Sequence, residues 1–177
     1  MKPWYKRFNR GHIRLGGGGG GGGVAGWPLT YFASVAYDTN NTRAGANQVS
    51  VSGFVLPYEL SFSQIAVYLD ITDAVGLYDF GIYTKAGALI ANIGAATQPN
   101  NDLQIYPTLQ GLQTIPPGLY LFGWTGNAAV VAIHFQDNAL SWVFNQDIAA
   151  SVGGALPAAI GAVAIAPSTA SWIFQLL

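Results

Sequence analysis

Period-two alternation of apolar residues limits the fold of this chain more than any other feature. In residues 118–125, GLYLFGWT, Tyr120, Phe122 and Trp124 fall on one face of an extended strand. Similar short runs, separated by turn residues about every eight to twelve positions, continue from residue 29 onward, and a helical period is almost absent. About ten such strands predict an all-β domain, an antiparallel β-sandwich of jelly-roll-like topology.

The clearest hairpin lies in residues 77–94, LYDFGIYTKAGALIANIG. Tyr78, Phe80 and Ile82 fall on one face of its first strand, whereas Leu77 and Tyr83 fall on the other. Asp79 falls on the opposite face and is expected to hydrogen-bond a turn. The hairpin turn itself is predicted at residues 85–87, where glycine can supply the positive φ that a tight connection needs.

Two further stretches predict where the chain changes direction. In residues 58–70 the apolar parity changes at Ser63-Gln64, which indicates a bulge or a crossing between sheets. Residues 29–37, LTYFASVAY, are expected to form a strand that leads into a polar turn over residues 38–47.

The composition indicates that other subunits cover part of the surface. Apolar residues make up 51% of the 177 residues and charged residues only 8%, whereas a typical soluble domain carries about 25% charged residues. So little charge leaves few groups to solvate a monomer, and several expected strands are apolar on both faces. We therefore expect a homo-oligomer, and a homotrimer above other stoichiometries. A surface rich in Ser, Thr, Asn and Gln is the alternative.

Charge is divided unevenly along the chain. The first fourteen residues carry five basic residues and no acid, whereas the remainder carries two basic and eight acidic residues, a net charge of −6. Residues 16–23 are eight consecutive glycines, which cannot hold one conformation alone. The sequence thus divides into an extended basic aromatic N-terminal arm (1–15), a glycine-rich tether (16–26) and a β-sandwich domain (27–177).

The arm combines aromatic anchors with cations, as docking peptides do. The residues expected to contact a partner are Trp4, Tyr5, Lys6, Arg7, Phe8, Arg10 and Arg14. The glycine run reaches about 27 Å at full extension, so it can link sites that do not superimpose. A disordered leader is the alternative. Nucleic acid is the less favoured partner, because arms that neutralise a genome are usually far richer in Arg.

Other segments argue against export and membrane insertion. Glycines occupy the place where a secretory signal carries its apolar region. Residues 153–167, the most apolar later stretch, are shorter than the ~20 residues of a spanning helix and contain two prolines. We expect them to form a loop and strand of small residues in a packed interior. The chain has no cysteine, so the fold must be held by packing rather than by disulfides or thiolate zinc sites.

Candidate catalytic and metal-binding groups are few. His12 lies in the arm, and His134 stands alone in an apolar strand, where a structural role is the commoner one. Asp70 and Asp73, in DITD, could help to bind Ca²⁺, but a capped turn is the favoured interpretation. The sequence contains no nucleophile elbow, zinc-protease motif or phosphate-binding loop. It therefore predicts a protein that is not an enzyme and that needs no metal or other cofactor.

Residues 48–136 carry a recognisable succession of strand motifs. They include FVLPYELSFSQIAVYLDITDAVGLYDFGIYTKAGALIANIGA, followed by GLQTIPPGLYLFGWTGNAAVVAIHF. The order is an apolar-Pro-aromatic start, YDFGIY-like and G-x-L-I-A-x-I-G strands, and PPG-x-Y before an aromatic strand. This succession resembles a β-sandwich module of tailed-bacteriophage virion proteins. Such modules serve as head decorations, head fibres, and tail or baseplate attachments, so the resemblance implies a structural role.

Three functions are compatible with these features. The first, which we expect, is a structural virion protein of a bacteriophage, anchored by its arm to a capsid or tail protein. The second is a lectin-like module for a host-surface glycan or receptor, with Tyr120, Phe122 and Trp124 as a stacking platform if their face is exposed. Filling the core or a trimer interface is the favoured role of that face. The third is a capsid protein whose arm binds nucleic acid.

Overall fold

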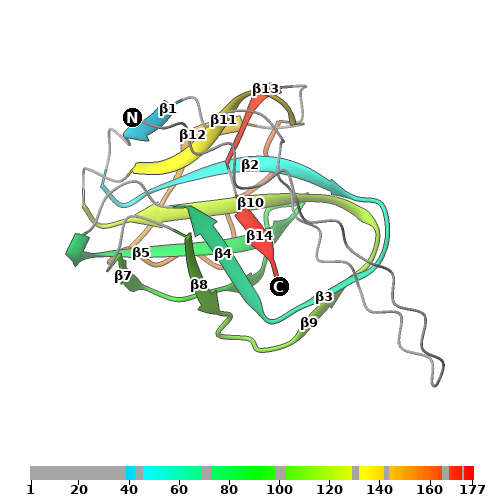
Figure 1. Cartoon of the computed structure of the whole chain (residues 1–177), viewed down its shortest axis with the longest axis horizontal. Helices are drawn as coiled ribbons and strands as arrows, with labels where there is room; N and C mark the ends of the chain where they lie inside the picture. Colours follow the sequence, from blue (N-terminus) through cyan, green and yellow to red (C-terminus); the bar gives the residue numbers. More distant parts are fainter. Residues whose placement is uncertain are drawn as a thin grey trace, which may run out of the picture.

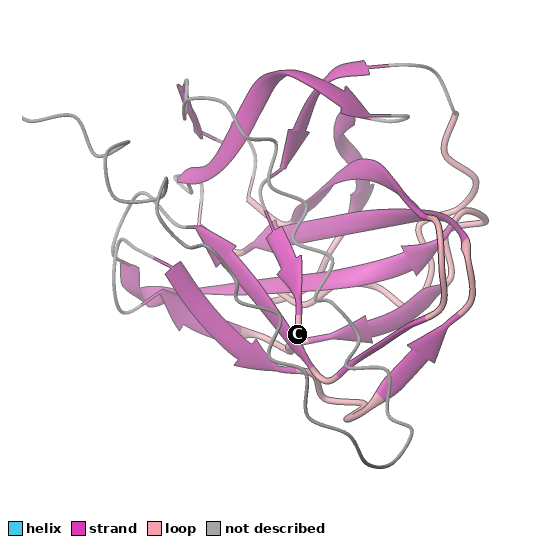
Figure 2. Cartoon of the chain, turned by 45° about the vertical axis from the view of Figure 1, so that its right-hand side comes forward, coloured by secondary structure: helices cyan, strands magenta, loops and turns pink. Residues whose placement is uncertain are grey.

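A computed structural model describes residues 39–42, 46–68, 73–98, 103–128, 132–141, 144–164, 168–172 and 174–177. These residues form fourteen β-strands and no helix (Figure 1; Figure 2). The strands are β1 (Thr39–Thr42), β2 (Gln48–Leu56), β3 (Leu60–Phe62), β4 (Gln64–Tyr68), β5 (Asp73–Thr84), β6 (Leu89–Asn92), β7 (Ala96–Gln98), β8 (Leu103–Pro107), β9 (Gln113–Ile115), β10 (Gly118–Gly126), β11 (Ala132–Ser141), β12 (Phe144–Ala150), β13 (Ser168–Trp172) and β14 (Phe174–Leu176). The all-β prediction is confirmed for this part of the chain, which holds no helix able to cross a membrane.

The strands pair antiparallel in four sheets. The largest has the order β12-β2-β10-β5-β6, and β7 also pairs with β5. The smaller sheets have the orders β14-β4-β8, β1-β11-β13 and β3-β9. Only one residue separates β13 from β14 in the sequence. The C-terminal segment therefore pairs with β11 through its first half and with β4 through its second half.

The main core lies between the large sheet and the β14-β4-β8 sheet, which Figure 1 shows in front of the long strands β2, β10 and β5. Phe54, Phe80 and Phe122 enter it from the large sheet, and Ile65 and Phe174 enter it from the smaller one. The rings of Phe122 and Phe174 stack with centroids 4.2 Å apart, which joins the two layers directly. This arrangement is consistent with a β-sandwich, and the jelly-roll-like connectivity stays a prediction.

The opposite face of the large sheet is covered by residues 151–164 of the same chain. The cluster on this face consists of Val49, Val51, Tyr83, Leu121 and Leu156. Backbone hydrogen bonds hold the segment in place: Leu89 N–H donates to the Ala158 carbonyl and Ile160 N–H to the Gly87 carbonyl, each at 2.9 Å. The sequence had assigned such two-faced apolar strands to contact with other subunits. For this face the covering element is the chain's own segment. The loop predicted there is confirmed for residues 151–164, but the predicted burial in a packed interior is wrong, because the segment lies on the surface and Val152 is 85% exposed.

The predicted hairpin and strand crossing are both confirmed. Gly87, in the turn after β5, has a φ of 85°. At the parity change, β3 ends at Phe62 and pairs with β9, whereas β4 begins at Gln64 and pairs with β14 and β8. The N–H groups of Ser63 and Gln64 both donate to the Leu177 carbonyl, at 2.7 and 2.9 Å. The chain thus passes from one sheet to another where the alternation slips.

The polar turn predicted over residues 38–47 is wrong in part, and several predictions for earlier residues lie outside the described part of the chain. Residues 39–42 were expected within a polar turn, but they form β1 and pair with β11. Pairing with a neighbouring strand overrides the weak strand propensity of Asn, because strand formation depends strongly on context. Asn47 does retain a turn conformation, with a φ of 57°. The arm, the tether and the strand predicted over residues 29–37 lie outside the described residues.

Candidate functional site

The residues predicted to dock a partner cannot be placed on the fold. Trp4, Tyr5, Lys6, Arg7, Phe8, Arg10 and Arg14 all lie outside the described residues. Their role stays a prediction from the sequence.

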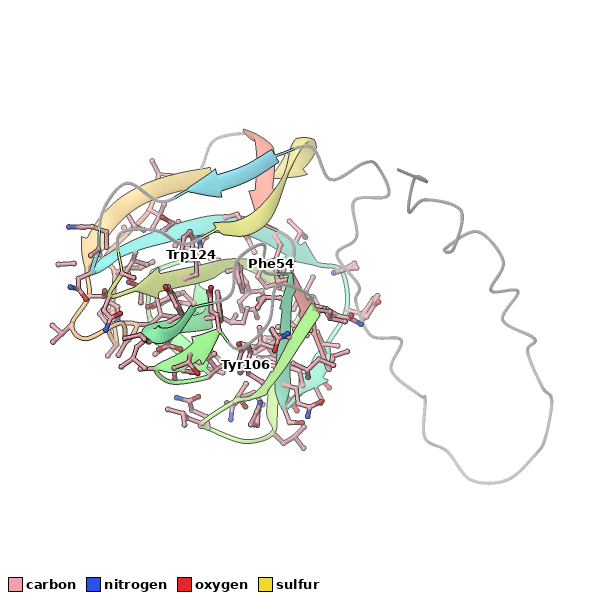
Figure 3. All side chains as sticks on the ribbon, turned by 60° about the vertical axis from the view of Figure 1, so that its left-hand side comes forward. Phe54, Tyr106 and Trp124 are labelled. Carbon is pink, nitrogen blue, oxygen red and sulfur yellow. The ribbon has the colours of Figure 1, made fainter. Side chains whose placement is uncertain are left out.

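The aromatic face of β10 points into the interior. Tyr120, Phe122 and Trp124 are all buried and belong to the main core. Figure 3 shows Trp124 with Phe54 and Tyr106 between the layers of the fold. A sugar ring stacks only on an exposed aromatic face. The condition for a stacking platform is therefore not met, and these side chains have the core-filling role that the sequence favoured.

The remaining candidate groups do not form a reactive or metal-binding cluster in the described part of the chain. Asp70 and His12 lie outside it, and Asp73 begins β5. His134 lies in β11, opposite Asn40 of β1. Among the described residues, no three side chains of the His, Cys, Asp or Glu type come close enough to hold a metal ion.

Asp79 is the centre of a buried polar network. Its Oδ2 accepts hydrogen bonds from Asn92 Nδ2 at 2.6 Å and from the Leu156 N–H at 2.9 Å. Asn92 is also paired with Gln110: Gln110 Nε2 donates to Asn92 Oδ1 at 2.8 Å, and the Asn92 N–H donates to Gln110 Oε1 at 2.9 Å. The network ties β5 to β6, to the loop after β8 and to residues 151–164. The sequence predicted only that Asp79 would bond a turn.

The electrostatics of this network suit a structural role. Burial raises the pKa of Asp79 above its ordinary value, although the hydrogen bonds from Leu156 and Asn92 oppose the shift. Tyr83, on the same face of β5, donates its hydroxyl to the Pro157 carbonyl at 2.9 Å. Burial, and then the charge of Asp79, raises the pKa of Tyr83. Both side chains are fully buried, and their hydrogen bonds hold the covering segment on the sheet.

An exposed apolar surface lies on β8 and the loop that follows it. We define the β8 surface as Leu103, Ile105, Leu109 and Leu112, whose exposed fractions are 38%, 51%, 70% and 70%. The side chains of β8 alternate, since Leu103 and Ile105 face outward whereas Tyr106 packs against the core, with its ring centroid 6.1 Å from that of Phe80.

None of the four residues of the β8 surface is charged, although Asp102 directly precedes Leu103 in the sequence. Residues 103–136 contain no Asp, Glu, Lys or Arg. An apolar surface of this kind, at the edge of a sheet, is suited to contact with another protein. Glutamines and Pro107 interrupt the apolar pattern of residues 103–112, so the sequence alone did not predict this surface. The alternation in LQIYP and the long gap between charges were the signals that could have revealed it.

Comparisons with known proteins add no family to these observations. No protein-family model, no curated protein and no solved structure matches the chain. Any assignment of function therefore depends on the residues and the geometry described above.

Proposed function

We propose that this chain is a structural virion protein of a bacteriophage, with a decoration, fibre or attachment role. In this proposal the arm anchors the β-sandwich body to a capsid or tail protein. The observation that carries the proposal is the β8 surface, four exposed apolar side chains at the edge of a sheet. A surface of this kind is more typical of a protein held in a lasting assembly than of a freely diffusing monomer.

The construction of the body supports a structural role. The segment that resembles the virion module, residues 48–136, supplies the three central strands β2, β5 and β10. One face of these strands packs on the β14-β4-β8 sheet, and the other is held by residues 151–164 through the Asp79 network. Burial on both faces favours a rigid body, as a particle component requires.

The division of charge supports anchoring through the arm. Five basic residues in the first fourteen are joined by glycines to a body whose net charge is −6. The cations can pair with carboxylates or backbone carbonyls of a partner, while the arm aromatics fill apolar pockets. We further infer that bodies associate with one another, as the low content of charged residues suggests, and that a homotrimer is the form in the particle.

Replacement of the arm aromatics tests this function. The variant carries Trp4→Ala, Tyr5→Ala and Phe8→Ala, and its matched control is Tyr58→Ala, an exposed aromatic residue of the body. We expect the triple variant to be lost from purified particles by at least about tenfold, whereas the control is incorporated normally, because hot-spot aromatics dominate docking energies. Quantitative mass spectrometry of particles measures the occupancy, and circular dichroism checks that both bodies fold.

Incorporation of the triple variant at wild-type occupancy would overturn the docking proposal. The arm would then be a leader or a nucleic-acid-binding tail. Salt-sensitive binding of the full chain to DNA, lost when the five basic residues are neutralised, would identify the second of these.

A further inference from the structure

We infer that copies of this chain bind one another through the loop that joins β8 to β9. We call residues 108–112 the leucine loop. In this inference Leu109 and Leu112 of each copy pack against the same two leucines of a neighbouring copy around a symmetry axis. The inference rests on the self-association proposed above and deepens it by naming the surface that carries it. It is independent of the protein that the arm binds.

The leucine loop presents its apolar side chains to solvent from a tight turn. The Gly111 N–H donates to the Thr108 carbonyl at 3.1 Å, and Gly111 has a φ of 67°, so the chain reverses over residues 108–111. Leu109 and Leu112 are each 70% exposed. Figure 1 shows this turn at the lower edge of the fold, between β8 and β9. Tight turns usually carry Gly, Pro, Asn, Asp or Ser for local reasons, and no such reason requires leucine at these two positions.

Side-chain hydrogen bonds hold the turn on β6. Gln110 Nε2 donates to Asn92 Oδ1 at 2.8 Å, and the Asn92 N–H donates to Gln110 Oε1 at 2.9 Å. The Leu109 N–H donates to the Asn92 carbonyl at 2.8 Å. Asn92 is itself buried and bonded to Asp79. The polar side chain of the turn is therefore bound to the body, whereas the two leucines face outward.

Further hydrogen bonds within the leucine loop fix its shape. The Thr108 hydroxyl donates to the Gly111 carbonyl at 2.7 Å. Gln113 Nε2 donates to the carbonyls of Gln110 and Leu112, each at 3.0 Å. A preformed contact surface loses little conformational entropy when it binds. The leucines are thus held in place for an apolar contact, and these carbonyl groups keep their partners when it forms.

Charge favours a second copy as the occupant. The body carries a net charge of −6, so two bodies repel each other and approach most easily where carboxylates are absent. Residues 103–136, which contain the leucine loop, are the longest stretch of the chain without Asp, Glu, Lys or Arg. A residue near a symmetry axis meets its own counterpart, so a charge there would meet a like charge, whereas leucine meets leucine.

Other occupants fit the leucine loop less well. The cations of the arm would find no carboxylate in residues 108–112. An anionic lipid surface attracts Lys and Arg, and residues 103–136 contain neither. A foreign protein with an apolar pocket is the remaining alternative, and it predicts that the chain alone stays monomeric.

The contact is small, and this determines the concentration at which it forms. Two leucines from each copy bury less than the roughly 1,200–2,000 Å² of a standard interface. We therefore expect reversible association at micromolar concentrations, strengthened where the arms hold copies close together on a particle.

Replacement of both leucines tests the surface. The variant carries Leu109→Asp and Leu112→Asp, and its matched control carries Tyr58→Asp and Val152→Asp, at exposed positions outside the loop. In sedimentation of the full-length chain over a concentration series, we expect the leucine variant to raise the dissociation constant of self-association at least about tenfold. The control should keep the wild-type value, and circular dichroism checks that both variants fold. Wild-type association in the leucine variant, equal weakening in the control, or a wild-type chain that is monomeric throughout would overturn the inference.

Cysteine cross-linking gives a second test that alters the loop less. The chain has no cysteine, so Leu109→Cys or Leu112→Cys introduces the only thiol. Residues that meet across a symmetry axis can form a disulfide where their Cα atoms are about 4.4–6.8 Å apart. Under mild oxidation of the full-length chain, we expect at least one of these variants to form a covalent dimer at least about tenfold faster than Val152→Cys, the control. Dimer formation at the control rate in both variants would overturn the inference.

Both measurements use no particles, so their outcome is separate from docking of the arm. If the leucine variant associates like the wild type while the arm triple variant is lost from particles, the inference is wrong and the anchoring role stands.

Discussion

Replacement of Asp79 by alanine would show how strongly the buried network holds residues 151–164 on the sheet. The substitution removes the oxygen that accepts from Asn92 at 2.6 Å and from the Leu156 N–H at 2.9 Å. A buried polar group left without a partner costs about 1–3 kcal/mol, so two orphaned donors cost about 2–6 kcal/mol. This is a large part of the roughly 5–15 kcal/mol by which a domain of this kind is stable.

Urea unfolding followed by tryptophan fluorescence measures the loss, and two variants control it. Asp79→Asn keeps an acceptor oxygen and is expected to lose less stability than Asp79→Ala. Glu59→Ala removes an exposed carboxylate and is expected to stay within about 0.5 kcal/mol of the wild type. Amide hydrogen exchange should show Leu156 and Ile160 losing protection in Asp79→Ala. Wild-type stability in Asp79→Ala, or unchanged protection at these two amides, would show that Asp79 does not hold residues 151–164 on the sheet.

Three further predictions concern pH, a turn and the core. Burial holds the pKa of Asp79 above its ordinary value of 3.8, so the stability that Asp79 contributes is fully present below pH 3.8 and is lost as the pH rises through the native pKa. The unfolding free energy of the wild type minus that of Asp79→Asn should therefore fall over this pH range and then level off. A difference that rises with pH would contradict the raised pKa. Gly87→Ala, at a φ of 85°, places a Cβ against the Gly161 carbonyl oxygen, whereas Gly111→Ala, at a φ of 67°, meets nothing within 4 Å. Thermal unfolding should therefore show the larger loss of stability for Gly87→Ala, and equal losses would mean that the turn moves freely. Phe122→Ala removes a ring stacked between the layers and should cost about 3–5 kcal/mol in urea unfolding, and a loss under about 1 kcal/mol would show that the layers are not joined there.

Local pattern predicted those parts of the fold that depend on local geometry. The two faces of β5 follow from alternation, because successive side chains of a strand point to opposite sides. The crossing at Ser63 follows from a slip in that alternation, since one extra residue reverses the faces. The turn at Gly87 follows from the requirement for a positive φ.

The parts that the sequence did not reveal depend on residues far apart in the chain. Asp79 meets Asn92 across 13 residues and Leu156 across 77, and no local period carries that information. Strand β1 exists because β11 pairs with it, against the weak strand preference of Asn. Low charge predicted that other subunits cover the apolar faces, and that association stays a prediction. It could not show that residues 151–164 cover one of them while the β8 surface stays exposed.

We propose that this chain is a structural part of a virion, held there by its arm. A reconstruction of purified particles by electron cryo-microscopy, at a resolution that shows side chains, tests it most directly. We expect density for the β-sandwich on the particle, with residues 1–14 bound in a crevice of a capsid or tail protein and the glycine run leading to it. Particles that contain neither this density nor any peptide of the chain would contradict the claim.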